Sequence, residues 1–185
     1  MIALYIIIGV LVLWFALSYN SLIRKRNEAD KAFASIDTMA KKRYDLIPNL
    51  VATVQQYMQH ERETLTKITE MRAKAISGNV SDEEKIALDG KISRAVSGIM
   101  VAVENYPDLK ANTNFLQLQG SLNEVEEQLS AARRFYNSAV TDYNNATQVV
   151  PTNIIAGMFN FKQKQLFEIS EQERQNVDVK SLFKS

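Results

Sequence analysis

The sequence has no cysteine, and His60 is its single histidine. Without cysteine, disulfides and a lipid-modified cysteine anchor are both excluded. The pair His60-Glu61 begins like a zinc-protease motif, but Thr64 stands where that motif requires its second histidine. Glycine motifs that cradle phosphate are absent, and so is the G-x-S-x-G nucleophile motif. We therefore expect no catalytic residues, no bound metal and no cofactor.

Proline and glycine are also scarce, with three and six residues in a chain of 185. Few turns can then form, which favours long helices and an all-α fold. A net charge of +1 lacks the clustered basic surface that nucleic acids require, so no nucleic-acid partner is expected. The chain after its N-terminal segment is long enough for one domain with a hydrophobic core.

No charged side chain precedes Arg24, and eleven of the sixteen residues from Ile2 to Leu17 are Leu, Ile, Val or Phe. On an insertion scale these eleven favour the bilayer by roughly 3 to 7 kcal/mol. Sixteen helical residues reach about 24 Å, and continuing to Ile23 gives about 33 Å, enough for a bilayer core. Residues 1–23 are thus predicted to be a transmembrane anchor, represented by Ile2, Leu4, Ile7, Val10, Leu13, Trp14 and Leu17.

A cleaved signal peptide is the alternative, but the segment has no basic start and its apolar run is long for a signal sequence. Arg24, Lys25 and Arg26 follow the apolar run directly. The positive-inside rule then places the N-terminus outside and the rest of the chain in the cytoplasm. We expect a single-pass membrane protein.

Residues 24–170 are predicted to form an antiparallel helical bundle, and residues 171–185 a C-terminal tail. The first helix continues from the anchor, with Leu22, Ala29, Phe33, Ile36, Ala40 and Ile47 on one face. Pro48 predicts a break or a kink near residues 45–47. The apolar phase survives the proline, so a kinked helix that continues to Gly78-Asn79 is favoured over a hairpin.

Two further helices have clear start signals. Ser81 with Glu84 has the spacing of a capping box and opens a helix that ends near Pro107. Asn112 or Thr113 is predicted to cap the next helix, after a loop over residues 106–114. That helix carries a seam at alternating spacings of three and four, typical of a bundle or a coiled coil: Phe115, Leu118, Leu122, Val125, Leu129, Ala132, Tyr136, Ala139 and Tyr143.

Pro151 ends this helix, and a last short helix is predicted from Thr152 or Asn153 to about Ser170. Its many apolar residues indicate core, subunit interface or membrane surface, with core or interface favoured because few basic residues flank it. The tail alternates apolar and polar residues from Val177 to Phe183 and is either a docking strand or disordered. Candidate oligomer contacts are Ile155, Met158, Phe159, Phe161, Phe167, Leu182 and Phe183.

The chain resembles the LemA family of bacterial single-span membrane proteins. The resemblance rests on residues 19–20 (YN), 43–51 (RYDLIPNLV), 60–61 (HE), 106–112 (YPDLKAN), 115–119 (FLQLQ), 133–137 (RRFYN), 142–144 (DYN) and 151–156 (PTNIIA). It implies a helical bundle on a short anchor, no established activity, similarity to a magnetosome-forming protein involved in membrane shaping, and association with zinc-dependent envelope proteases. Its motif residues are Arg43, Tyr44, Asp45, Pro48, Asn49, Glu61, Tyr106, Pro107, Arg133, Tyr136, Asn137, Tyr143, Asn144 and Pro151.

Buried polar contacts are expected among these residues. Glu61 and Arg72 lie near the inward stripe of their helix, where a buried arginine–carboxylate pair would specify register rather than perform chemistry. The tyrosines 44, 136 and 143 predict a polar network, with rings in the core and hydroxyls bonded.

Two functional hypotheses follow. In the first, the protein is a non-enzymatic homo-oligomeric scaffold that organises the membrane or envelope. In the second, it is a monomeric adaptor for a membrane protease, a transporter or an envelope-stress signalling protein. The first is favoured.

Overall fold

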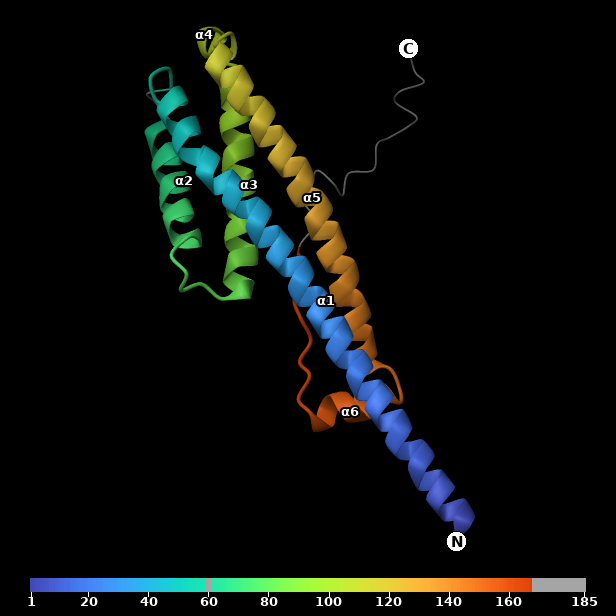
Figure 1. Ribbon diagram of the computed structural model, residues 1–185. Coiled ribbons are helices and arrows are strands. Elements are labelled where there is room, and N and C mark those ends of the chain that lie inside the picture. The colour runs from blue at the N-terminus through green and yellow to red at the C-terminus, as the bar shows by residue number, and fades with distance from the viewer. Residues whose placement is uncertain (59–60, 168–185) are drawn as a thin grey trace, which may run out of the picture.

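The longest element, α1, is a single helix from Ile2 to Val54. The computed structural model describes residues 1–58 and 61–167. In Figure 1 the N-terminal part of α1 projects from the bundle, while its C-terminal part lies among the other helices. The projecting part is long and apolar enough to cross a membrane, with a mean hydropathy of 2.4 over its most apolar window. The predicted anchor therefore continues without a linker into the bundle core.

Helix α1 passes through Pro48 without ending, as the preserved apolar phase predicts. The prediction that it continues to residue 77 is wrong. The helix ends at Val54, and α2 (Arg62–Ala75) runs back along the end of α1 (Figure 1). The chain does form a helical hairpin, but its turn lies between α1 and α2, after Pro48, and α1 stays one helix through the proline. By folding back, α2 buries Leu65 and Ile68, which a straight continuation would leave in water.

Helix α3 (Asp82–Val103) begins where the capping signal predicts, since the Ser81 hydroxyl accepts a hydrogen bond from the Glu84 N–H at 3.2 Å. The turn before it contains Gly78 at φ 74°, a left-handed conformation that glycine adopts without steric cost. The predicted loop after α3 includes one helical turn, α4 (Pro107–Lys110). Asn112 then caps α5 (Thr113–Gln148) by accepting from the Phe115 N–H at 3.1 Å.

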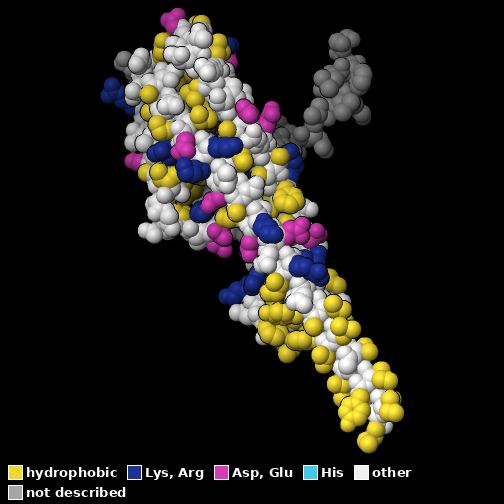
Figure 2. Space-filling view, viewed as in Figure 1, with side chains coloured by type: hydrophobic (Ala, Val, Ile, Leu, Met, Phe, Trp, Pro, Cys, Tyr) yellow, Lys and Arg dark blue, Asp and Glu magenta, His cyan; other side chains and the backbone are white. Residues whose placement is uncertain are grey.

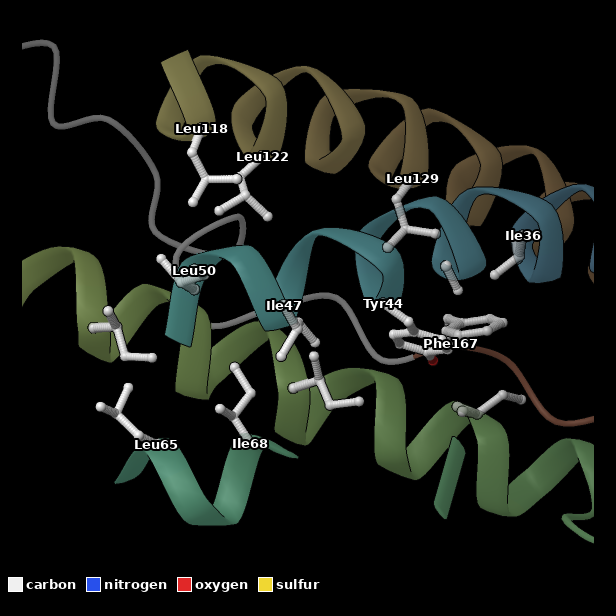
Figure 3. Close-up of a cluster of buried hydrophobic side chains, with 14 of the residues drawn as sticks. Ile36, Tyr44, Ile47, Leu50, Leu65, Ile68, Leu118, Leu122, Leu129 and Phe167 are labelled. Carbon is white, nitrogen blue, oxygen red and sulfur yellow. The ribbon is translucent and has the colours of Figure 1, made fainter. Parts of the chain in front are cut away.

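The core lies mainly between α1 and α5, which run antiparallel, with α2 and α3 added at the end farthest from the membrane anchor (Figure 1). Figure 3 shows Leu118, Leu122 and Leu129 pointing from α5 toward α1, and Ile47 of α1 pointing the opposite way, toward Leu65 and Ile68 of α2. Most of the predicted seam of α5 is buried, including Leu129 at 0% exposure and Phe115 at 1%. The all-α bundle predicted from the sequence is confirmed.

The last described helix, α6 (Thr152–Met158), is much shorter than predicted. It ends because Asn160 takes a positive φ of 55°, with Asn160 N–H bonded to the Gly157 carbonyl and Phe161 N–H to the Ala156 carbonyl. This is the Schellman arrangement that terminates helices, and asparagine tolerates its left-handed position. Residues 161–167, which we call the strap, then run back along the bundle in a non-helical conformation (Figure 1). Residues 168–170 and the tail lie outside the described residues.

Candidate functional site: an ion cluster and an asparagine ladder

A buried group of charged side chains joins α1, α3 and α5. Arg43 of α1 donates from Nη2 to Asp89 Oδ1 at 2.5 Å and from Nη1 to Glu126 Oε2 at 3.0 Å. Arg133 of α5 binds the same two carboxylates, with Nε donating to Asp89 Oδ2 at 3.0 Å and Nη1 to Glu126 Oε1 at 3.1 Å. The Ser93 hydroxyl accepts from Arg43 Nη1 at 2.6 Å and donates to Glu126 Oε1 at 3.2 Å. We call these five residues the ion cluster.

The ion cluster is balanced in charge and is buried at Arg43 and Asp89. Arg43 is 1% exposed and Asp89 is 3% exposed, whereas Glu126 keeps its carboxylate near the surface. Burial opposes the charge on Arg43, but the carboxylates of Asp89 and Glu126 outweigh it and raise the pKa of Arg43. Burial likewise works against the Glu126 carboxylate, yet Arg43 and Arg133 together lower its pKa. Arg43 and Glu126 therefore both favour their charged forms in the folded chain.

Two guanidinium groups and two carboxylates neutralise one another here. Such a cluster has one satisfactory arrangement, because a shift of any helix would strand a buried charge. It therefore specifies the register of α1, α3 and α5. Of its members, Arg43 and Arg133 are motif residues, whereas Asp89, Ser93 and Glu126 escaped the sequence analysis.

Pro48 creates a second polar contact between helices. Proline has no N–H, so the Tyr44 carbonyl, four residues earlier, receives no helical hydrogen bond from position 48. Arg72 of α2 fills this place, with its Nε donating to the Tyr44 carbonyl oxygen at 2.7 Å. The expected Arg72–Glu61 pair is thus wrong. Arg72 instead fastens α2 to the carbonyl that Pro48 leaves free, while Glu61 stands at the N-cap of α2 without a side-chain cap bond.

The strap is held to α5 by side chains that bind its main chain. Asn144 of α5 donates from Nδ2 to the Lys164 carbonyl at 2.9 Å and accepts from the Lys164 N–H at 2.9 Å. Asn137 repeats the pattern with Phe167, at 3.0 Å and 2.9 Å. Each carboxamide thus pairs with both polar groups of one strap residue, as a neighbouring β-strand would.

Two tyrosines complete this row, which we call the asparagine ladder (Tyr136, Asn137, Tyr143 and Asn144). The Tyr143 hydroxyl donates to the Lys162 carbonyl at 2.8 Å, and the Tyr136 hydroxyl donates to the Gln165 carbonyl at 2.9 Å. Seven residues of α-helix rise about 10.5 Å, and three residues of extended chain cover about 10 Å. The Tyr-Asn pairs at heptad spacing therefore match strap residues three apart, in antiparallel direction.

Side-chain contacts of the strap add to the ladder. Lys164 Nζ lies 2.7 Å from Asp30 Oδ1 of α1. Phe167 is 6% exposed and packs edge-to-face on Tyr136 with ring centroids 5.3 Å apart. Burial, together with nearby carboxylates, raises the pKa of Tyr136 to about 12, so its hydroxyl keeps its proton and donates at neutral pH.

The remaining motif residues serve local structure. Asp45 is exposed and pairs with Lys41 at 3.1 Å, and the Asn49 carbonyl accepts from Thr53. Tyr106 and Pro107 form the N-cap and first residue of α4, and Pro151 is the N-cap of α6. Among residues 1–58 and 61–167, no three His, Asp or Glu side chains gather to hold a metal ion. His60 lies outside the described residues.

The predicted anchor and oligomer residues divide by exposure. Leu4, Val10 and Leu13 of the predicted anchor are 59%, 61% and 62% exposed, whereas Leu22 near its end is buried. Ile155 and Phe167 are buried within their own chain at 1% and 6%, so in this fold they offer no outer surface. The predicted contacts that keep large exposed areas are Met158 and Phe159. Leu182 and Phe183 lie outside the described residues.

Comparison with known proteins gives the family and several relatives of this chain. Protein LemA of Metamycoplasma hominis is 29% identical over 95% of this chain and 80% of its own length. Magnetosome protein MamQ 2 of Paramagnetospirillum magneticum is 21% identical over 81% of this chain, and MamQ of Magnetospirillum gryphiswaldense is 19% identical over 80%. The match spans only 64% of either MamQ protein. The profile of the LemA family matches residues 32–181, which include the ion cluster and the ladder, and the chain belongs to the LemA family.

Proposed function

We propose that this protein is a non-enzymatic, membrane-anchored scaffold of the bacterial inner membrane that assembles with copies of itself. The observation that carries the proposal is the asparagine ladder. It holds a strap by main-chain atoms, which any copy of the chain presents equally well.

Exchange of the strap between neighbours would preserve every contact of the ladder. The four ladder side chains bind carbonyl and N–H groups of residues 162–167. A strap from a second copy offers the same groups in the same order. Exchange of an identical element between protomers is a low-cost route to assembly, because no new interface has to be created.

The anchor supports this exchange because it fixes the height of the ladder above the membrane. Helix α1 runs unbroken from the anchor to Val54, so the ladder of every copy stands at the same distance from the membrane. Copies in one membrane are also parallel. A strap can therefore reach the ladder of a neighbour by lateral movement alone, and binding loses less entropy than in solution.

A non-enzymatic role is supported by the ion pairs that join the two arginines of the ion cluster to its two carboxylates, although Arg43 Nε has no hydrogen-bond partner among the described residues. The ion cluster binds its own members and sets helix register. Figure 2 shows acidic and basic side chains interspersed on the visible face of the bundle instead of converging on one cleft. The similarity to magnetosome proteins supports a membrane-associated role for this chain.

Cross-linking between two tagged copies tests self-assembly. The chain has no cysteine, so introduced thiols react alone. Asp30→Cys in one tagged copy and Lys164→Cys in another replace the ion pair between α1 and the strap and leave the ladder intact. Co-expressed in membranes and treated with a short bis-maleimide, they should give a cross-linked dimer that carries both tags.

The control replaces Lys164→Cys with Thr66→Cys, an exposed position on α2. This pair should give no dimer beyond random collision. Cross-linking only within a chain that carries both Asp30→Cys and Lys164→Cys would refute strap exchange. Recovery of one unlike protein in place of a second copy would favour the adaptor hypothesis, in which the ladder serves a partner.

We also propose that the bundle faces the cytoplasm, on the basis of Arg24, Lys25 and Arg26 directly after the apolar run. Protease added to intact spheroplasts should then leave the bundle undigested, and permeabilised cells should lose it. Digestion in intact spheroplasts would place the bundle on the outer side of the membrane.

A further inference from the structure

Helix α6 is placed at the end of the membrane anchor. Its residues Ile155 and Ala156 are buried against Leu22 of α1. Phe159, directly after α6, packs on Tyr19 with ring centroids 4.9 Å apart and on Phe15 at 6.0 Å. These α1 residues span the end of the uncharged run, which stops before Arg24. In Figure 1, α6 lies crosswise to α1 at this level.

The other side of α6 and the turn before it are apolar and exposed. Ile154 is 59% exposed, Met158 is 69% and Phe159 is 48%. In the turn that leads into α6, Val149 and Val150 are 58% and 73% exposed. We call α6 with residues 149–151 and Phe159 the foot of the bundle. Figure 2 shows the apolar surface of the anchor continuing upward onto the bundle end.

The charged residues nearest the foot in sequence are basic. No Asp or Glu occurs in residues 1–27 or in residues 143–167. The same two stretches contain Arg24, Lys25, Arg26, Lys162 and Lys164, of which Lys164 pairs with Asp30 of α1. Basic residues beside a membrane-spanning helix are attracted to anionic headgroups, at about 1 kcal/mol each near the surface. In Figure 2 the Lys and Arg side chains follow directly above the apolar region.

We propose that the foot rests in the lipid surface of the membrane that α1 spans, with Ile154, Met158 and Phe159 at the boundary between headgroups and acyl chains. Lipid is the occupant because the foot continues the surface that the anchor already presents to lipid. The part of α1 that α6 and Phe159 contact runs from Phe15 to Leu22 and is about 10 Å long. This length is similar to the depth of about 5–10 Å to which interfacial helices are buried in a membrane surface. A second protein would have to cover the foot in the headgroup layer itself.

From the sequence, core or subunit interface is favoured over membrane surface for the last helix, because few basic residues flank it. In the folded chain, α6 shares the basic run of α1, which is more than a hundred residues away in sequence.

The test measures the depth of single labels in the full-length protein. Met158→Cys and Ile154→Cys are labelled with a small environment-sensitive fluorophore, in nanodiscs of phosphatidylglycerol and phosphatidylcholine. Both positions are exposed, so labelling should leave the helical circular dichroism unchanged. Leu11→Cys in the anchor is the lipid control, and Leu116→Cys, 50% exposed at the far end of α5, is the aqueous control.

Nitroxide lipids labelled near the headgroup end of the chain should quench positions 154 and 158 several-fold more strongly than position 116. Iodide should show the reverse order. If iodide quenches 158 as strongly as 116, the foot stands in water and the proposal is wrong. If neither quencher reaches 158, protein covers the foot, which also overturns the proposal. Strap exchange has its own readout, the cross-link between positions 30 and 164 of two copies, so failure of the foot proposal and failure of strap exchange are told apart.

Discussion

Replacement of Arg72 should be costly only while residue 48 is proline. In the native chain, Arg72→Leu leaves the Tyr44 carbonyl without a donor, inside a residue that is 8% exposed. An unsatisfied buried carbonyl costs about 1–3 kcal/mol. With alanine at position 48, the main-chain N–H restores the helical bond to Tyr44, and the same Arg72→Leu change then removes packing and a charge alone.

The measurement is a double-mutant cycle of Pro48→Ala and Arg72→Leu, by urea unfolding in detergent followed by circular dichroism. We expect a coupling free energy of about 1–2 kcal/mol, within the range for residues in contact. Lys67→Leu is the matched control, because Lys67 is an exposed cation of α2 that pairs with Glu63. Its cost should be equal in both backgrounds. If the cost of Arg72→Leu is also equal, within about 0.5 kcal/mol, Arg72 does not replace the missing donor and our interpretation of Pro48 is refuted.

Three further perturbations test the cluster and the ladder. Asp89→Asn should lower the free energy of unfolding by about 3 kcal/mol because Arg43 loses a buried counter-charge. The double change Arg43→Met with Asp89→Leu should lower the free energy of unfolding by less than the sum of the two single changes, and additive losses would contradict this. Asn144→Leu removes two hydrogen bonds and should speed proteolysis of the strap, and the exposed neighbour change Asn145→Leu should not. The pKa of Tyr136 is raised to about 12, so the free energy of unfolding should fall by up to about 3 kcal/mol as pH rises from about 10 through 12. Tyr136→Phe should remove the part of this fall that comes from ionisation of Tyr136.

The direction of that pH effect follows from the proton. A tyrosine with a raised pKa holds its proton more tightly in the folded chain than in the unfolded chain. Its contribution is complete below the unfolded pKa of about 10 and disappears as pH passes the folded value. Unfolding curves that are parallel for the native protein and Tyr136→Phe across this range would show that the buried hydroxyl is not the cause.

Elements whose signals are local were predictable from the sequence. Spacings of three and four identified α5, because one helix face has to be apolar to pack on α1. Ser81 and Asn112 marked helix starts, since their side chains satisfy N–H groups within three residues. The passage of α1 through Pro48 was predictable for the same reason, as the apolar phase is a property of the helix itself.

Contacts between distant segments were not predictable in this way. The apolar phase of α1 continues through Val54 and Met58 toward Leu65, so nothing local indicates that the chain turns after Val54. Tertiary packing overrides helix propensity here. The cluster did leave a signal that could have been used. Arg43, Asp89 and Glu126 each interrupt or flank an apolar stripe on a different helix, and together with Arg133 their charges sum to zero, but a single stripe cannot show which charges meet.

The two proposals together give the scaffold a mechanical basis. A bundle carried by one spanning helix alone could rotate about its anchor and tilt freely. With the foot in the lipid surface and the strap tied from α6 to α5 by the ladder, the bundle would instead have two fixed points on the membrane. The ion cluster at Arg43 lies about 30 Å beyond Leu22 along α1, so a small tilt of α1 at the foot would move the ion cluster a long way parallel to the membrane. Loss of the foot contact should therefore weaken assembly of neighbouring copies even where every ladder residue is intact, because their straps and ladders would no longer meet at one height.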